Sequence, residues 1–520
     1  MKQPRPETKQ TPSRIGRHVV GLLAVLAANA ACAQDAGSGE TPHGLFVKPR
    51  VSVSETYTDN NLLTSNNRDA ALITTVSPGV SISARGGSIS GTLDYSLSGI
   101  AYLKSDQPDR LQNNLNAQGR IDFVPQVFFV NAYANISQQS NSPLGAQSVD
   151  SNLANPNRVE TQTLTIAPTL QGHFGGLATY QLQGSATGTN QMDTAVGDSH
   201  QLSGSFRMDG LNAGQLRWWS LLSTTQSHFK TNAANNNDDQ AMLGLRYQPD
   251  VDFFMTASAG KERSNYLTGK NEDAALYGAS FSWTPTVRTT LNLDWQHHNY
   301  GDSHSFKFEH RMSRSVWSVS DNQSVTQASQ LNQADLGSNY DLLFVQFASI
   351  EPDPVKRDAL VRAYLQTYGL NPGSQNVVGF LSNVPVLSHS SQASFALEGA
   401  RTTATATLTR TTSRQLGENS QTAGPLLNFS LINQQGFSVN VAHKLTPLSS
   451  LSAAYTQTRG SGAGGIAFAD SSNTLHSLTA NWTSRLGRRG TLTLMVRHAQ
   501  EVGANPYRES AMSATFVQTF

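Results

Sequence analysis

The chain has 520 residues, with 37 Lys and Arg against 36 Asp and Glu. Only 14% of the residues are charged, whereas a soluble enzyme usually carries about 25%. The near-zero net charge provides no basic surface for nucleic acid, so no nucleic-acid partner is expected. The single Cys cannot pair within the chain, which excludes a disulfide scaffold. The length fits several ordinary domains or one large repetitive architecture.

Residues 1–33 have the pattern of a secretory signal peptide. Basic residues precede an apolar run over 19–28, and Ala31 and Ala33 form the small-x-small motif of a cleavage site. The apolar run would rise only about 15 Å as a helix, half of what a bilayer requires. We therefore predict cleavage after Ala33, with residues 34–45 as a short periplasmic segment.

Removal of this leader changes the composition of the chain. Five basic residues and Glu7 are lost, so the 37 basic and 36 acidic residues of the full chain become 32 basic and 35 acidic residues. Cys32 is also removed, and a lipidated Cys32 is disfavoured because Asn29 stands where that signal prefers an aliphatic residue. An acidic, cysteine-free exported chain is typical of the envelope of a Gram-negative bacterium.

Residues 46–520 alternate between apolar and polar side chains. Examples are 89–99, 178–184, 289–295 and the last segment, 512–520. A period of two places the two sets on opposite faces of a β-strand. The segments also have roughly ten to fifteen residues, longer than the five or six that soluble sheets favour.

Two kinds of connection alternate between these segments. One kind is short and built from turn residues, as at 85–87, 124–126, 249–250, 284–286 and 487–490; the other is long and rich in Asn, Asp and Ser, as at 58–70, 139–158 and 460–473. Short turns at one end and long loops at the other are the arrangement of an outer-membrane β-barrel. We predict an all-β fold, a large antiparallel transmembrane barrel of about 18–22 strands with a wide polar lumen. A soluble exported β-solenoid is the competing interpretation.

Aromatic residues gather beside the short turns. Such clusters indicate an aromatic girdle at the membrane interface, although ordinary sheet core also favours aromatic residues. The candidate girdle residues are Phe128, Phe129, Trp218, Trp219, Phe253, Phe254 and Trp283.

The final strand ends in an aromatic residue. Phe520 and Phe516 share one face of that strand with Met512. A terminal aromatic on an alternating strand resembles the sorting signal that the bacterial barrel-assembly machinery reads, although Gln518 stands where a hydrophobic residue is usual. We therefore expect that machinery and outer-membrane lipid among the partners.

Residues 323–388 interrupt the strand pattern. Asp353-Pro354 is typical of a helix start and Gly369 of a helix end, and a weaker helical stretch covers 340–350. We predict a helical hairpin inserted in a long loop, which either stands outside the cell or folds inward as a plug or constriction. The candidate constriction residues are Lys356, Arg357, Arg362, Tyr364 and Tyr368.

No catalytic motif is found in the sequence. Neither a Gly-x-Ser-x-Gly elbow nor a phosphate-binding Gly-rich loop is present. His297 and His298 point to opposite faces of a strand, and His304 and His310 lie beyond a turn, so no converging set of metal ligands is predicted. We expect no catalytic site, metal or cofactor, and the protein is not expected to be an enzyme.

Several segments resemble a family of outer-membrane β-barrels encoded with PEP-CTERM/exosortase and exopolysaccharide gene clusters. The segments that carry the resemblance are 57–62, 95–103, 281–286, 315–320 and 350–355. The resemblance implies an outer-membrane location and an association with polysaccharide export or surface assembly, with polysaccharide and export-system proteins as partners. It implies no catalytic residues.

Two functions follow from these observations. The first is a porin-like channel, or an accessory, in exopolysaccharide secretion or surface assembly. The second is a non-conducting envelope scaffold or adhesin whose extracellular loops bind a partner.

Overall fold

The computed structural model describes most of the chain after the leader. The described residues are 44–191, 197–211, 214–230, 235–326, 330–331, 340, 343–344, 347, 357, 361, 380–382, 384–417, 429–464 and 471–520. The predicted signal peptide, including Ala31 and Ala33, lies outside them.

The fold consists of β-strands of 10 to 17 residues and one very short strand pair. The strands are β1 (Gly44–Thr58), β2 (Ala71–Arg85), β3 (Ile89–Leu103), β4 (Arg110–Val124), β5 (Phe128–Ser140), β6 (Arg158–Phe174), β7 (Ala178–Gln191), β8 (Ser199–Gly210), β9 (Leu216–Phe229), β10 (Asn236–Asp250), β11 (Phe253–Ser264), β12 (Glu272–Thr286), β13 (Thr289–His298), β14 (Gly301–Arg311), β15 (Ser315–Thr326), β16 (Gln330–Leu331), β17 (Phe380–Leu381), β18 (Val386–Glu398), β19 (Thr402–Gln415), β20 (Leu431–Lys444), β21 (Ser449–Ala463), β22 (Ser471–Leu486), β23 (Gly490–Gly503) and β24 (Tyr507–Thr519).

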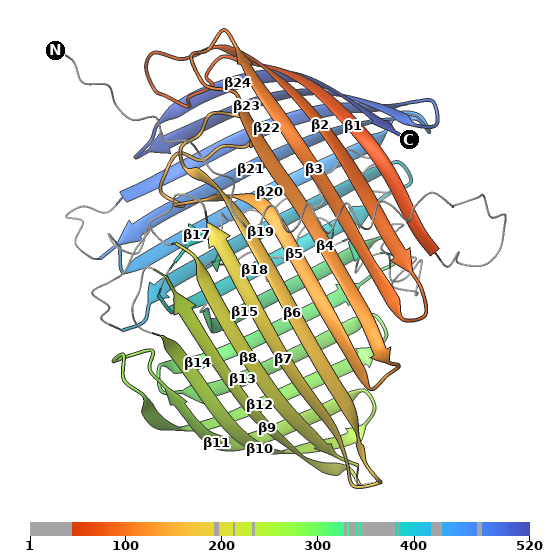
Figure 1. Cartoon of the computed structure of the whole chain (residues 1–520), viewed down its shortest axis with the longest axis vertical. Coiled ribbons are helices and arrows are strands. Elements are labelled where there is room, and N and C mark those ends of the chain that lie inside the picture. The colour runs from red at the N-terminus through yellow and green to blue at the C-terminus, as the bar shows by residue number, and fades with distance from the viewer. Residues whose placement is uncertain are drawn as a thin grey trace.

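Twenty-two of these strands form one closed antiparallel barrel (Figure 1). Each strand pairs with the next along the chain, β15 pairs with β18, and β24 pairs with β1 to close the ring. Closure leaves no unpaired strand edge. The predicted antiparallel barrel is therefore confirmed, at the upper limit of the predicted strand number. No helix among the described residues is long and apolar enough to cross a membrane.

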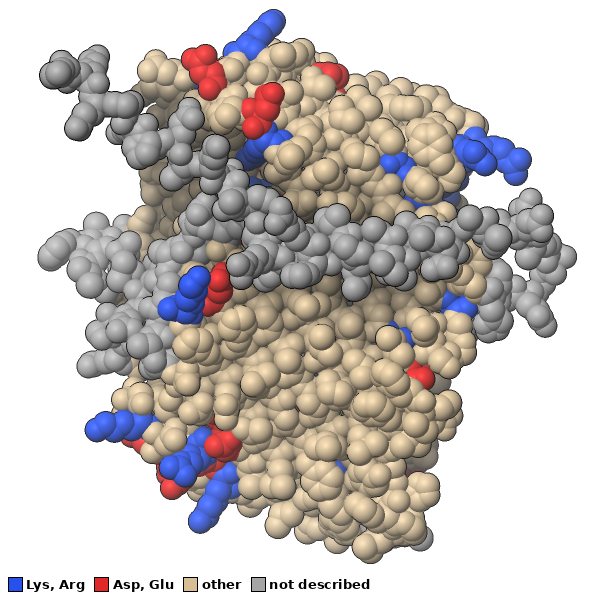
Figure 2. Space-filling model, in the orientation of Figure 1, with Lys and Arg blue, Asp and Glu red and all other residues tan. Residues whose placement is uncertain are grey.

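The alternation of the sequence separates an outward face from an inward face. On β10, Leu243 is 67% exposed on the outside, while its neighbour Met242 is 2% exposed on the inside. On β19 the inward positions are a row of buried threonines, and Leu408 is exposed outward. On the face shown in Figure 2, most of the visible charged side chains lie toward the two rims of the barrel, and other residues make up most of the visible wall between them.

Short turns lie at the end of the barrel where the C-terminus lies, and the long loops lie at the other end. Two of these turns differ from their predicted places. Pro249 and Pro285 belong to the last residues of β10 and β12, and the turns follow at 251–252 and 287–288. Each proline stands at a strand end beside a register irregularity, where a strand tolerates a missing backbone donor.

Three of the predicted girdle residues face inward, and for them the prediction is wrong. Adjacent residues of a strand point to opposite faces, so the pairs Phe128-Phe129, Trp218-Trp219 and Phe253-Phe254 must divide between outside and inside. Phe129 and Trp219 are buried, and each of the three inward rings carries an arginine over its face, at 3.6 to 5.0 Å from the ring centroid; the pairs are Arg120–Phe129, Arg207–Trp219 and Arg246–Phe254. Phe128, Trp218, Phe253 and Trp283 lie on the outward face.

Candidate functional site: a polar lumen narrowed by inward-folded segments

The loop between β5 and β6, residues 141–157, folds back into the barrel. On one side it is held by β3 and β4. Tyr102 donates its hydroxyl hydrogen to the carbonyl of Asn152 at 2.7 Å, and Arg110 donates to the carbonyl of Ser151 at 2.7 Å. Because these donors bond to backbone atoms, the path of the loop is fixed independently of its side chains.

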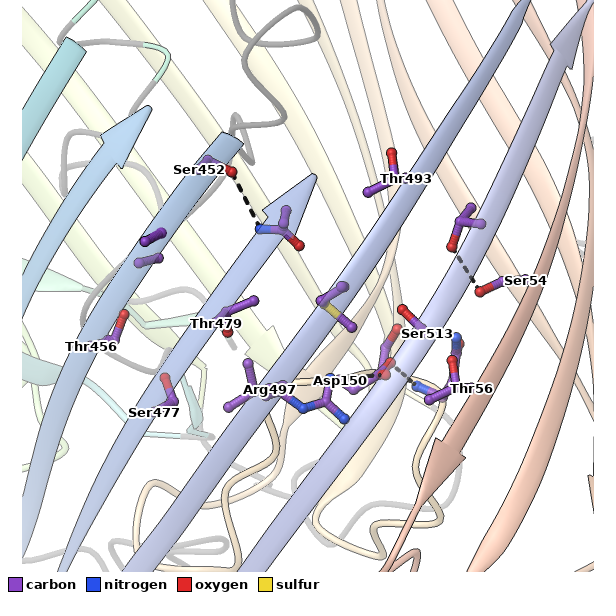
Figure 3. Close-up of a pocket in the computed structure, with 18 of the residues that line it drawn as sticks. Ser54, Thr56, Asp150, Ser452, Thr456, Ser477, Thr479, Thr493, Arg497 and Ser513 are labelled. Carbon is purple, nitrogen blue, oxygen red and sulfur yellow. Dashed lines mark hydrogen bonds and ion pairs between the residues drawn. The ribbon is translucent and has the colours of Figure 1, made fainter. Parts of the chain in front are cut away.

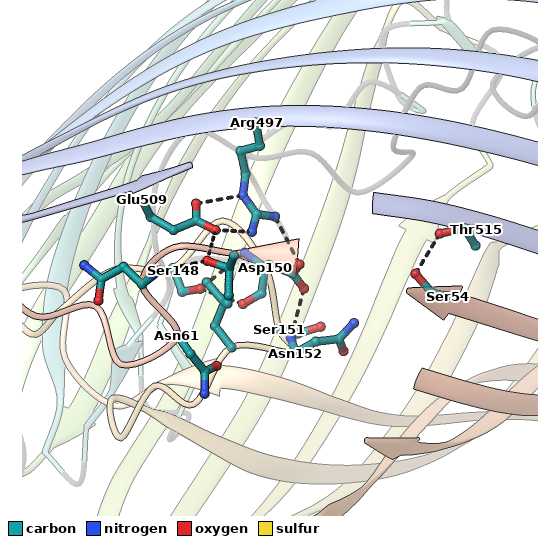
Figure 4. A network of polar contacts seen from close by, with 12 residues as sticks. Ser54, Asn61, Ser148, Asp150, Ser151, Asn152, Arg497, Glu509 and Thr515 are labelled. Atoms are coloured by element: carbon teal, nitrogen blue, oxygen red, sulfur yellow. Dashed lines mark hydrogen bonds and ion pairs between the residues drawn. The ribbon is translucent and has the colours of Figure 1, made fainter. Parts of the chain in front are cut away.

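On its other side the same loop is held by β23 and β24 (Figure 4). The Arg497 guanidinium bonds both carboxylate oxygens of Glu509, at 2.8 and 3.1 Å, and its third nitrogen reaches Asp150 of the loop at 3.0 Å. These three residues form the Arg497 network. Their side chains are 2%, 1% and 13% exposed in the order Arg497, Glu509, Asp150, so the charges are paired almost out of contact with water.

Apolar packing reinforces these polar contacts. Leu153 is buried in a cluster with Ile73, Ile100, Tyr102 and Tyr507, which belong to β2, β3 and β24. The loop therefore covers the inner wall where the first and last strands of the barrel meet, much as a fixed constriction would.

A cavity of about 540 Å³ lies beside this loop (Figure 3). Asp150 and Arg497, which are paired with each other, supply its charged groups. The rest of its wall is mainly hydroxyl and amide groups from β1 and β20–β24; those labelled in Figure 3 are Ser54, Thr56, Ser452, Thr456, Ser477, Thr479, Thr493 and Ser513. Such a surface offers many hydrogen-bond donors and acceptors and little net charge.

The inserted segment also reaches the inner wall. Leu343, Phe347 and Val361 form a buried cluster with Ala442, an inward-facing residue of β20 two positions before the strand ends at the short-turn side. β17 lies close to β5, on the other side of the barrel (Figure 1). These contacts place parts of the segment inside the barrel.

Six described residues of the insertion have helical backbone conformation, namely Tyr340, Leu343, Phe344, Phe347, Arg357 and Val361. Arg357 lies over the ring of Phe344 at 4.8 Å. The other candidate constriction residues, Lys356, Arg362, Tyr364 and Tyr368, lie outside the described residues, so the helical hairpin as a whole stays a prediction.

A second buried polar group closes the loop between β13 and β14. Glu262 bonds His298 Nδ1 at 2.6 Å with one oxygen and accepts the backbone N–H of Asn299 with the other, while His298 Nε2 lies 3.0 Å from Ser303 Oγ. His298 stacks on Tyr300 at 4.7 Å. Burial raises the pKa of Tyr300 and of the neighbouring Tyr266, so both loop phenols remain neutral. No local sequence pattern indicates this group, because its members come from three strands and the loop itself.

The residues of the predicted assembly signal lie at the barrel seam. Phe516 and Met512 face outward on β24, and the backbone N–H of Phe520 donates to the carbonyl of Pro49 at 2.9 Å. Their recognition by the assembly machinery stays a prediction.

Comparison with known proteins supports the architecture. No family model matches the chain, and no curated protein matches it. Among solved structures, the FrpB iron transporter from Neisseria meningitidis (F5-1 variant) matches with a TM-score of 0.50 and 10% identity, covering 92% of this chain and 83% of that one. The protein is an outer-membrane β-barrel. At 10% identity the similarity shows the fold alone and gives no information about a cargo or a partner.

Two other similar structures are less close in shape. The siderophore receptor PirA from Acinetobacter baumannii matches with a TM-score of 0.45 and 9% identity, covering 93% of this chain and 81% of that one. The outer membrane protein OpdK from Pseudomonas aeruginosa matches with a TM-score of 0.36 and 10% identity, covering 91% and 99%. With the bacterial outer membrane as its location, the outward face of the barrel contacts lipid, the short turns lie on the periplasmic side and the long loops on the extracellular side.

Proposed function

We propose that the protein is a constricted outer-membrane channel for an uncharged, hydroxyl-rich solute, and that it serves as a porin-like channel or accessory in exopolysaccharide secretion or surface assembly. The observation that carries the proposal is the cavity beside loop 141–157, whose wall is mainly serine, threonine and asparagine side chains. Such groups can exchange hydrogen bonds with sugar hydroxyls as they do with water. The polysaccharide setting rests on the resemblance described above, and no catalytic step is assigned to the protein.

Two segments that fold into the barrel favour a constricted channel over an open pore. Loop 141–157 is tied to the wall by the Arg497 network, and the insertion packs against Ala442. Arg497 is near the middle of β23, whereas Ala442 lies close to the short-turn end of β20, so the two segments contact the inner wall at different depths.

The pairing of β16 with β17 allows a clean test of the insertion. The two short strands bring Leu331 opposite Phe380, so residues 332–379 can be replaced by a short Gly-Ser linker without moving the barrel strands. We expect this variant to give larger single-channel steps in planar bilayers than the full chain. A matched variant, Asp150→Asn, breaks the ion pair of the loop while leaving the insertion in place, and we expect a smaller rise in conductance.

Selectivity tests the nature of the solute. In a liposome-swelling assay we expect the linker variant to pass a neutral oligosaccharide faster than an anionic one of equal size. If the linker variant and a variant that combines the linker with Asp150→Asn both fail to conduct, the channel proposal fails. In that case the non-conducting scaffold, whose loops bind a partner, is the better explanation.

A further inference from the structure

Three ionisable side chains meet on the lipid-facing wall of the barrel. They are His304 of β14, Asp321 of β15 and His389 of β18, on adjacent strands. Asp321 follows the exposed residues Trp317 and Val319 at alternate positions of β15, so it points outward as they do. A charged group on this face is costly at the middle of the bilayer and much less so near its surfaces, so the height of the cluster on the wall matters.

The three side chains converge on one point. His304 Nε2 lies 2.6 Å from one oxygen of Asp321, and His389 Nε2 lies 3.1 Å from both oxygens. The two imidazole rings are 5.5 Å apart and nearly perpendicular. Ser391 donates its hydroxyl hydrogen to Asp321 at 2.5 Å and fixes the orientation of the carboxylate. We call these four residues the Asp321 cluster.

We propose that His304, Asp321 and His389 form a binding site for a divalent transition-metal ion, with Zn²⁺ as the ion we test. Two imidazole nitrogens and one carboxylate oxygen are a ligand set that this class of ions prefers, and three protein ligands leave a fourth position for an exchangeable ligand. Within the described part of the chain, these are the residues whose His and carboxylate atoms come together as a set of three.

The geometry requires only a small adjustment to accept the ion. Metal–ligand distances of about 2.0–2.2 Å place the ligand atoms of a tetrahedral site on the order of 3.3 Å apart. The contacts to Asp321 are 2.6 and 3.1 Å, so they would open by roughly 0.7 and 0.2 Å to reach that spacing. Ser391 then acts as an outer partner that orients a ligating carboxylate.

The place of the cluster in the barrel also suits a metal. His304 is the fourth residue of β14 and His389 the fourth of β18, so both lie near the extracellular rim. The side chains are 28%, 31% and 42% exposed in the order His304, Asp321, His389, which leaves the ion a route from the aqueous side. β15 and β18 are also the strands between which the insertion leaves the wall, so a bound ion would join three strands at its root.

The test uses the full-length barrel without a histidine tag, refolded in detergent and cleared of metal with a chelator. Isothermal titration with Zn²⁺ and metal analysis after dialysis should give one ion per barrel. His304→Gln, His389→Gln and Asp321→Asn should each weaken binding about tenfold or more, and Ser391→Ala should weaken it about 10–100-fold, as expected for an outer partner. His310→Gln is the matched control, because His310 lies on the same face of β14 and bonds Thr289 instead.

A spectroscopic measurement separates binding at this site from adventitious binding. Co²⁺ bound to the full chain and to His310→Gln should show the visible absorption of a site with imidazole ligands, and the double variant His304→Gln/His389→Gln should lose it. Heat-modifiable migration on a gel confirms that each variant is folded. The proposal is overturned if the folded full chain binds no ion, or if the double variant retains the ion and its spectrum.

Discussion

The Arg497 network and the Asp321 cluster use similar groups in opposite surroundings. Each joins three separate parts of the barrel through carboxylates and cationic or titratable partners. The Arg497 network lies on the inner wall and ties loop 141–157 to it, with side chains 1% to 13% exposed. In the Asp321 cluster, on the outer wall, His304, Asp321 and His389 have side chains 28% to 42% exposed. Burial therefore separates a structural group from one that can exchange a ligand.

This difference has an energetic basis. A buried charge that loses its partner keeps its full desolvation cost, so removing one member of a buried pair is strongly destabilising. An exposed pair loses little, because water replaces the partner. The inner network should therefore control stability and loop position, and the outer cluster should control ligand binding.

The largest effect is expected from Arg497→Met. The substitution leaves Glu509 and Asp150 buried without their cation, and we expect a loss of about 3–5 kcal/mol in the free energy of unfolding. Urea unfolding followed by tryptophan fluorescence measures it. Arg50→Met is the matched control, because the Arg50–Asp94 pair also faces the lumen but its side chains are 25% and 49% exposed; we expect a loss of about 1 kcal/mol or less. Equal losses in the two variants would contradict the comparison.

The aromatic pairs sharpen the same contrast between inside and outside. Phe129→Leu removes the ring whose centroid lies 3.6 Å from the Arg120 guanidinium. We expect the free energy of unfolding to fall by about 1–2 kcal/mol, whichever detergent or lipid surrounds the barrel. Phe128→Leu removes an outward ring that stacks on Phe123, so its effect should change with the thickness of the bilayer. Urea unfolding in lipids of two chain lengths distinguishes the two. A lipid-dependent effect of Phe129→Leu would mean that its ring contacts the membrane.

The barrel was largely predictable because its signals are local. Alternation and turn residues act over a few neighbours, and they were enough for the antiparallel barrel and its strand number. The aromatic pairs show the limit of the pattern: adjacent residues cannot share a face of a strand, so a cluster in the sequence is not a cluster on the wall.

The two polar groups could not be found in the same way, since their members are far apart in the chain. Asp150 and Arg497 are separated by 347 residues, and His304 and His389 come together only because β14, β15 and β18 are neighbours. The prediction of no metal site considered only histidines that are close in sequence. Strand pairing across the insertion and the inward folding of loop 141–157 bring these residues together, and a local sequence pattern contains neither.

A smaller effect is expected from Asp321→Asn in the presence of a chelator. The side chains of the Asp321 cluster are partly exposed, so we expect a loss of about 1 kcal/mol or less without metal. With Zn²⁺ present, the full chain should become more stable by mass action and the variant should not. Thermal unfolding with and without the ion measures both the loss of stability in the variant and the gain of stability on Zn²⁺ binding. A large loss in the chelator would show that the cluster is a structural group like the Arg497 network.

The smallest effect is expected from a serine-directed fluorophosphonate probe, which we predict does not react with the protein. Ser303, His298 and Glu262 are bonded in the order that activates a serine nucleophile. However, Glu262 also accepts the backbone N–H of Asn299, and His298 is stacked on Tyr300, so the group holds the β13–β14 loop closed. On the outer wall, Ser391 donates its hydroxyl hydrogen to Asp321 and not to a histidine. Ser391 therefore lacks the histidine base that would activate a serine nucleophile. Mass spectrometry of the probe-treated barrel should find neither serine labelled. Labelling that disappears in Ser303→Ala but persists in Ser305→Ala would instead identify Ser303 as a nucleophile and give the lumen a chemistry beyond conduction.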